Sequence, residues 1–116
     1  MEDITIWHNP RCSKSRNALN LLEEKNIEAK VVKYLDETPS KDELKDILNK
    51  LNMTAQELMR KGETIYKELA LENETNEDKL LEAMINNPKL IERPVIIKGD
   101  KAVIARPIEN LEELLK

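Results

Sequence analysis

The one cysteine of this 116-residue chain lies in a polar, cationic segment. Arg11, Lys14 and Arg16 flank Cys12, and His8 precedes it by four residues. Nearby positive charge favours the thiolate over the thiol, and the thiolate is the nucleophilic form of cysteine. The alternative is that this lone cysteine is a small buried hydrophobic side chain. Because its neighbours are charged rather than apolar, we expect Cys12 to be a nucleophile.

The one histidine of the chain is close to the cysteine in sequence. His8 and Cys12 make a poor metal site, because a structural zinc needs four ligands and the chain has no other Cys or His. We therefore predict no metal and interpret His8 as a group that tunes the Cys12 thiol. The alternative is that His8 is a plain loop residue.

The predicted elements around Cys12 place it between a strand and a helix. Residues 3–7 are predicted to form a strand, and residues 14–25 an amphipathic helix. Ala29–Leu35 is rich in β-branched residues and is predicted to form a second strand. This order is that of a βαβ unit with a parallel strand pair. Cys12 would then face the unpaired N–H groups and the positive end of the helix dipole, which also favours the thiolate.

The middle of the chain is predicted to be helical. Ser40 with Glu43, and Thr54 with Glu57, form capping-box patterns, and each pattern predicts the start of a helix. A further helix is expected to begin at Thr75, because an apolar helical pattern follows it.

The end of the chain returns to strand patterns. Two β-branched runs flank Gly99-Asp100, a pair that suits a two-residue hairpin turn. Pro107 fits the first position of a final helix. The element order is therefore β-α-β, a helical insert at about residues 40–91, and β-β-α. We predict a single α/β domain, residues 1–116, with a mixed four-stranded sheet.

Composition excludes several classes of protein. Hydrophobic residues make up 40% and charged residues 36% of the chain, as in globular domains rather than disordered segments. The net charge of −4, with no long basic run, argues against nucleic-acid binding. No apolar run reaches the roughly 20 residues of a membrane span. One cysteine and no N-terminal export signal indicate a cytoplasmic protein.

The order of the elements, with a reactive cysteine after the first strand, resembles a thioredoxin-like fold enlarged by a helical insert. In such folds the proline before the third strand is commonly cis and lies against the active-site loop. Pro94, directly before Val95, occupies that position. Since only a small minority of X-Pro bonds are cis, both isomers stay open at this point.

Five separated segments resemble signature motifs of the glutaredoxin-linked arsenate reductase family. They occur in the order found in that family, and the resemblance covers the whole chain. Charged residues surround the cysteine where the best-studied members have small uncharged ones, so the run HNPRCSKSR is closer to a sub-branch than to operon-encoded resistance enzymes. The five segments are Ile6-Trp7-His8-Asn9-Pro10-Arg11-Cys12, Ser15-Arg16-Asn17, Glu57-Leu58-Met59-Arg60-Lys61, Asn87-Pro88-Lys89-Leu90-Ile91-Glu92-Arg93-Pro94 and Ala105-Arg106-Pro107.

The resemblance implies a role for each candidate site residue. Cys12 would be the nucleophile, and His8 would help to keep its thiol ionised. Arg60, Arg93 and Arg106 would bind the substrate, arsenate or a related oxyanion. Guanidinium groups suit this task because their planar fork matches the oxygens of a tetrahedral oxyanion and stays charged.

Each arginine also has an ordinary structural explanation. Arg60 lies near a predicted helix C-terminus, where a cation is favourable. Arg93 and Arg106 have acidic neighbours along the chain with which they could form surface ion pairs. Arg16 lies one helical turn from Cys12 and ranks below these three as an oxyanion ligand.

The resemblance further implies that the reducing thiols come from outside the chain. With one cysteine, the chain cannot resolve a mixed disulfide on Cys12 by itself. Glutathione is the implied electron-donating co-substrate, and glutaredoxin is the implied partner that resolves the mixed disulfide. No bound cofactor is implied, and we expect a monomer.

Two other functions fit part of the sequence. A glutathione-dependent thiol oxidoreductase without arsenate activity needs only the thiolate and a glutathione site. An Spx-like regulator that contacts RNA polymerase is the second alternative. Such regulators carry a Cys-x-x-Cys switch, whereas Ser15 stands three positions after Cys12 here. We therefore rank arsenate reductase first.

Overall fold

The structure is a computed structural model that describes residues 3–116. These residues divide into two compact units. Thr38–Glu92 forms the second unit, and the described residues on either side of it in sequence form the first. Over residues 3–116, no helix has the length and apolar character needed to cross a membrane.

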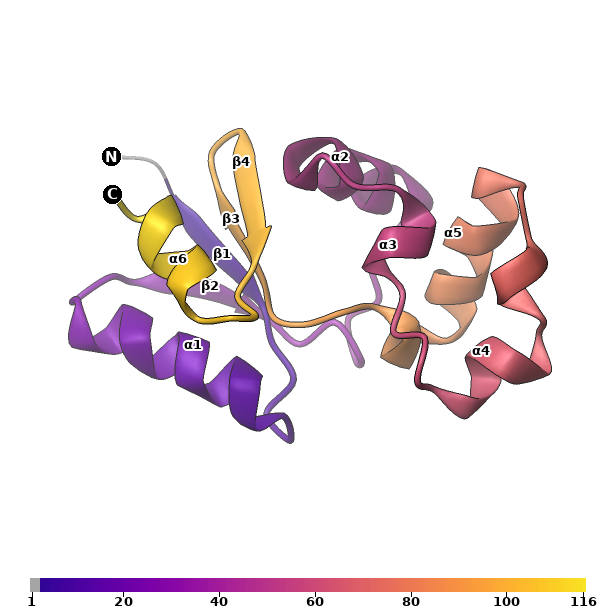
Figure 1. Ribbon diagram of the computed structural model, residues 1–116. Coiled ribbons are helices and arrows are strands. Elements are labelled where there is room, and N and C mark those ends of the chain that lie inside the picture. Colours follow the sequence, from indigo (N-terminus) through magenta and orange to yellow (C-terminus); the bar gives the residue numbers. More distant parts are fainter. Residues whose placement is uncertain (1–2) are drawn as a thin grey trace. The chain divides into compact units, whose positions relative to one another are not determined.

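The first unit contains a mixed four-stranded sheet (Figure 1). The outer strand β2 pairs in parallel with β1, whereas β1 with β3 and β3 with β4 are antiparallel pairs. The predicted α/β class, mixed sheet and parallel first pair are therefore confirmed. In spatial order the strands are β2 (Ala29–Val32), β1 (Ile4–Trp7), β3 (Val95–Lys98) and β4 (Lys101–Ile104).

Strand β2 is shorter than its sequence pattern predicts. The prediction of a strand up to Leu35 is wrong, because β2 ends at Val32. The amides of Asp36 and Glu37 both donate to the carbonyl of Lys33, over 2.9 and 2.8 Å. A turn held by these two bonds takes the place of the last predicted strand residues.

The C-terminal elements contain one correct turn and one misplaced helix start. The β3–β4 hairpin turns at Gly99-Asp100 as predicted, and Gly99 has a φ of 57°, which a residue without a Cβ adopts readily. The last helix, α6 (Glu109–Leu114), does not begin at Pro107 as predicted. Its N-cap is Ile108, whose carbonyl accepts from the amide of Glu112 over 3.4 Å, whereas the Pro107 carbonyl accepts from the amide of Asn110, over 3.0 Å, and so closes a tighter turn before the helix.

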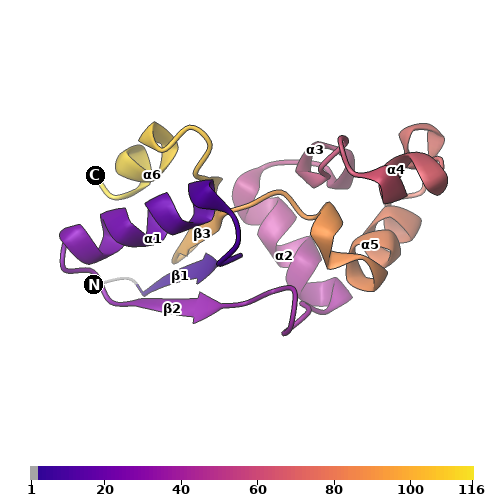
Figure 2. The same cartoon turned by 90° about the horizontal axis from the view of Figure 1, so that it is seen from below.

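Two helices cover one face of the sheet. Figures 1 and 2 show α1 (Ser13–Glu24) and α6 on the same side of β1 and β3. Each large apolar side chain buried there contributes roughly 1.5–3 kcal/mol. This packing holds the first turn of α1 at the end of β1. The buried residues of this core are Ile4, Ile6, Ala18, Leu22, Ile96, Ala105, Leu111 and Leu114.

The second unit is helical, and its two predicted capping boxes are present. Ser40 Oγ accepts from the amide of Glu43 over 3.1 Å, and Thr54 Oγ1 accepts from the amide of Glu57 over 3.2 Å. Both glutamates return a bond to the capping residue's amide, which completes each box. The helices are α2 (Lys41–Leu51), α3 (Ala55–Leu58), α4 (Thr64–Glu68) and α5 (Glu77–Asn86), with 3₁₀ turns η1 (Leu71–Asn73) and η2 (Pro88–Leu90).

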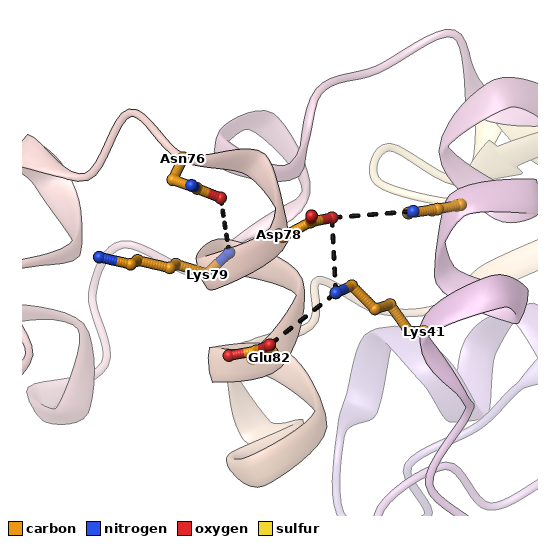
Figure 3. A network of polar contacts seen from close by, with 6 residues as sticks. Lys41, Asn76, Asp78, Lys79 and Glu82 are labelled. Carbon is orange, nitrogen blue, oxygen red and sulfur yellow. Dashed lines mark hydrogen bonds and ion pairs between the residues drawn. The ribbon is translucent and has the colours of Figure 1, made fainter.

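Helix α5 begins later than predicted and is joined to α2 by ion pairs. Asn76, rather than Thr75, is its N-cap, because the Asn76 side chain accepts from the amide of Lys79 over 3.2 Å. Lys41 Nζ lies 3.5 Å from Asp78 and 3.8 Å from Glu82 (Figure 3). These pairs are exposed and contribute at most about 1 kcal/mol each. Stability comes mainly from the buried side chains of this unit, which include Leu44, Leu58, Leu80, Leu81 and Met84.

Candidate active site

Cys12 is the N-cap residue of α1, at the end of the loop that follows β1. Its amide donates to the carbonyl of Asn9, and its carbonyl accepts from the amide of Arg16, both over 3.0 Å. The residue is buried, with 9% of its surface exposed. The predicted position between a strand and a helix start is correct.

The surroundings of Cys12 favour its thiolate. Burial raises the pKa of the thiol, but hydrogen bonds and charge outweigh it, so that the pKa is lower than that of an ordinary thiol. The backbone N–H of Ser15, the side chain and charge of Arg93, and the backbone N–H of Lys14 lower the pKa of Cys12 in that order. The two N–H groups belong to the first turn of α1, where backbone donors have no partner within the helix.

The basic residues that flank Cys12 in sequence are not the source of this effect. The sequence predicts that their charges favour the thiolate. In the structure, Arg93 and the backbone N–H groups at the start of α1 lower the pKa of Cys12 instead. Arg11 and Lys14 are exposed. Arg16 Nη1 donates to the carbonyl of Pro10 over 2.9 Å and so fixes the loop before Cys12.

His8 is buried behind this loop. Its amide donates to the Val32 carbonyl over 2.8 Å, and its Nδ1 lies 2.7 Å from Ser15 Oγ. Burial and the charges of Lys33 and Arg16 lower the pKa of His8, so its ring is neutral at pH 7. The ring therefore adds no positive charge near Cys12. Its predicted part in keeping the thiol ionised stays a prediction.

Ser15 is a site residue whose partners the sequence did not reveal. It is fully buried, and its Oγ contacts His8 Nδ1 and accepts from the Asn9 amide over 3.0 Å. Its backbone N–H also helps to lower the pKa of Cys12. The signal in the sequence was its spacing of three from Cys12, which places both residues on one side of the helix start.

Arg93 and Arg106 lie in two adjacent segments of the first unit. Arg93 precedes Pro94, the residue directly before β3, and Arg106 comes two residues after the end of β4. The amide of Ala105 donates to the carbonyl of Pro94 over 3.0 Å, which joins the two segments. The Arg93–Pro94 and Arg106–Pro107 peptide bonds are both cis, which answers the question that the sequence left open at Pro94. Of the predicted arginines, Arg93 is the one whose side chain hydrogen-bonds Cys12.

Arg60 belongs to the second unit and is held there by carboxylates. Its Nη1 lies 2.6 Å from Glu63 Oε1, and its Nε lies 3.8 Å from Glu92 Oε1. Its amide donates to the carbonyl of Leu90 over 2.7 Å, and its side chain is 27% exposed. The guanidinium thus already binds oxyanionic groups of the protein, which sequence reasoning did not anticipate.

The arrangement around Cys12 is suited to nucleophilic attack on an anionic electrophile. A thiolate attacks, while backbone N–H groups at a helix N-terminus and a guanidinium can bind the oxygens of its target. Across residues 3–116, no group of three or more His, Cys, Asp or Glu side chains could hold a metal ion.

Comparison with known proteins identifies relatives over nearly the whole chain. Residues 7–114 match the ArsC family. An arsenate reductase from Neisseria meningitidis is 52% identical over 117 residues, which cover 99% of this chain and 100% of that protein. YfgD of Escherichia coli, whose name states no activity, is 47% identical over 116 residues, 98% of each chain. An arsenate reductase structure from Vibrio cholerae superimposes with a TM-score of 0.93 at 42% identity and covers 97% of both chains. The predicted thioredoxin-like fold is confirmed by this likeness.

Proposed function

Because the chain belongs to the ArsC family, we propose that it is a glutathione- and glutaredoxin-dependent arsenate reductase with Cys12 as the nucleophile. The observation that supports this most strongly is the hydrogen bond from the Arg93 side chain to the Cys12 sulfur. A guanidinium in this position stabilises the thiolate and can also bind an oxygen of the arriving oxyanion. The Arg93 guanidinium would then interact with both the Cys12 thiolate and the substrate.

The first step joins arsenic to the enzyme. The Cys12 thiolate attacks the arsenic of dihydrogen arsenate, an S–As bond forms and an As–O bond breaks. The leaving oxygen takes one proton from solvent and departs as water. Arsenic stays As(V), and the adduct carries one negative charge, which Arg93 and the N–H groups of the α1 N-terminus can bind.

The sulfurs of Cys12 and glutathione then supply the two electrons that reduce arsenic. Glutathione attacks, an S–S bond to Cys12 forms and the S–As bond breaks, with its electron pair staying on arsenic. Arsenic becomes As(III) and leaves as arsenous acid after taking the glutathione proton and one from solvent. Glutaredoxin next removes the glutathionyl group by thiol–disulfide exchange, which returns Cys12 to the thiolate. The outside thiol is needed because the chain has a single cysteine.

The four candidate arginines have different roles in this proposal. Arg93 and Arg106 lie on adjacent segments of the first unit and bind oxygens of the substrate. The part of Arg60 in substrate binding stays a prediction from the family resemblance, because its guanidinium lies in the second unit, where it pairs with Glu63. Arg16 holds the loop through Pro10 and acts only indirectly.

A turnover assay tests the proposal. The purified protein with arsenate, glutathione and glutaredoxin should form arsenite, and Cys12→Ser should abolish this. Ser13→Ala, a change beside Cys12 at an exposed hydroxyl, serves as the matched control and should keep the wild-type rate. Turnover by the wild type no faster than by Cys12→Ser would refute the arsenate assignment.

A protection experiment separates this function from a thiol oxidoreductase without arsenate activity. Iodoacetamide alkylates the Cys12 thiolate, and arsenate or sulfate bound beside the sulfur should slow that reaction. Sulfate serves because it is a tetrahedral oxyanion that does not react. Alkylation that neither anion slows would favour the thiol oxidoreductase.

A further inference from the structure

The contact between His8 and Ser15 joins two buried side chains. His8 Nδ1 lies 2.7 Å from Ser15 Oγ, and the two residues are 5% and 0% exposed. A neutral histidine has one ring nitrogen that donates and one that accepts, so the distance alone does not say which group is the donor. The other hydrogen bond of Ser15 decides this question.

The Ser15 hydroxyl has one proton to donate and two lone pairs that accept. The Asn9 amide lies 3.0 Å from Ser15 Oγ and can only donate, so it occupies one lone pair. Among the described residues, His8 Nδ1 is the one hydrogen-bond partner of Ser15 Oγ that can accept a proton. A buried hydroxyl proton without an acceptor is costly. The hydroxyl therefore donates to Nδ1.

We propose that Ser15 is a positioning residue that holds His8 in the neutral tautomer with its proton on Nε2. In this form His8 offers one N–H donor and no charge. Such a donor can hydrogen-bond a substrate oxygen or the thiolate, whereas an imidazolium would also act through its charge. This use of His8 rests on the proposed function, but the tautomer itself does not.

The charged groups around His8 agree with a neutral ring. Burial is the largest factor that disfavours a second proton on the imidazole, followed by the charges of Lys33, after β2, and Arg16, on α1; together they lower the pKa of His8. The other titratable groups at the N-terminus of α1 are Cys12, its N-cap, and Lys14 in its first turn. Val32 on β2 contributes only the carbonyl that accepts from the His8 amide.

Nitrogen-15 NMR of the ring tests the proposal directly. The chain has one histidine, so the two ring-nitrogen signals need no assignment among residues. At pH 7 we expect Nε2 to carry the proton and Nδ1 to be the acceptor. A wild-type ring with its proton on Nδ1, or on both nitrogens, would overturn the proposal, and this measurement needs no variant.

Two variants test the part played by Ser15. Ser15→Ala should let both tautomers coexist and should move the titration of the ring towards that of an ordinary histidine. Ser15→Thr keeps the hydroxyl and should keep the wild-type tautomer, as should Ser13→Ala, an exposed serine in the same helix turn. A folded Ser15→Ala protein with the wild-type tautomer would show that Ser15 does not set it.

The NMR measurement also separates this inference from the proposed function. It is made without arsenate or glutathione. If His8 has its proton on Nε2 but the protein forms no arsenite, only the proposed function is refuted. If the protein forms arsenite but His8 has its proton on Nδ1, only the inference about Ser15 is refuted.

Discussion

The side chain of Arg93 hydrogen-bonds the sulfur of Cys12, although the two residues belong to opposite ends of the chain. The sheet explains this contact. Cys12 follows β1, Arg93 precedes β3, and the two strands pair antiparallel with Trp7 opposite Val95. The end of β1 and the start of β3 therefore lie at the same end of the sheet, where the guanidinium of Arg93 reaches the sulfur of Cys12.

We predict that Arg93→Ala raises the pKa of Cys12 and slows the reduction of arsenate. Without the guanidinium, the pKa of Cys12 should rise, because a hydrogen bond and a positive charge are lost. The pH profile of iodoacetamide alkylation should move to higher pH. Arsenate turnover should fall about 100-fold to 1,000-fold, the usual effect of removing one donor to a developing oxyanion.

Arg93→Lys is the informative comparison for that variant. It keeps the charge but loses the planar fork. Its alkylation profile should lie between those of the wild type and Arg93→Ala. Identical alkylation profiles for all three proteins would contradict the assigned contact.

The ionisation of Cys12 predicts a pH dependence of stability. The pKa of Cys12 is lower in the folded state than in an ordinary thiol, so over the interval between these values the unfolded chain binds more protons. The free energy of unfolding should therefore rise with pH across that interval. As pH falls through the folded pKa, this stabilisation is lost. Urea unfolding of wild type and Cys12→Ser at several pH values should show a steeper rise in the wild type, because His8, whose pKa is also lowered, contributes to the rise in both proteins.

We predict that Glu63→Gln lowers the stability of the protein only slightly. Glu63 is 2.6 Å from Arg60 Nη1, and both side chains are partly exposed. An ion pair of this kind contributes up to about 1 kcal/mol. The free energy of unfolding in urea should fall by no more than about 1 kcal/mol.

Glu68→Gln provides the matched control, because Glu68 is an exposed glutamate in the same unit. It removes the same charge from the protein without touching Arg60. Equal losses of stability for the two variants would show that the Arg60–Glu63 pair contributes nothing beyond net charge.

The core of the first unit predicts a large loss of stability for Leu111→Ala. Leu111 is fully buried between α6 and the sheet, and its truncation leaves a cavity. The free energy of unfolding should fall by about 2–5 kcal/mol. Leu69→Ala removes the same atoms at a residue that is 48% exposed and should cost less than about 0.5 kcal/mol. Urea denaturation measures both, and similar losses would contradict the assigned core.

Local sequence signals predicted most of the fold. Capping boxes at Ser40 and Thr54 mark helix starts because the side-chain bonds that define them are made within three residues. Gly99-Asp100 marks the hairpin for the same local reason. The misplaced ends at Leu35 and Pro107 depend instead on turn hydrogen bonds that compete with strand and helix, which periodicity does not register.

The site was predictable in part. The position of Cys12 follows from a strand next to a helix, but its stabilising cation does not, because Arg93 reaches it only through the sheet pairing. The partners of Ser15 depend on how the loop after β1 folds back on α1. The carboxylates around Arg60 likewise depend on tertiary packing, since Glu92 approaches it from another segment.

A single-turnover experiment with mass spectrometry tests whether Cys12 is the nucleophile that reduces arsenate. The reduced protein is mixed with arsenate and glutathione in the absence of glutaredoxin. We expect one arsenite released per protein molecule and one glutathionyl group in disulfide linkage on Cys12, both dependent on arsenate. Arsenite without the Cys12 adduct, or the adduct formed equally well without arsenate, would show that Cys12 does not carry out the reaction.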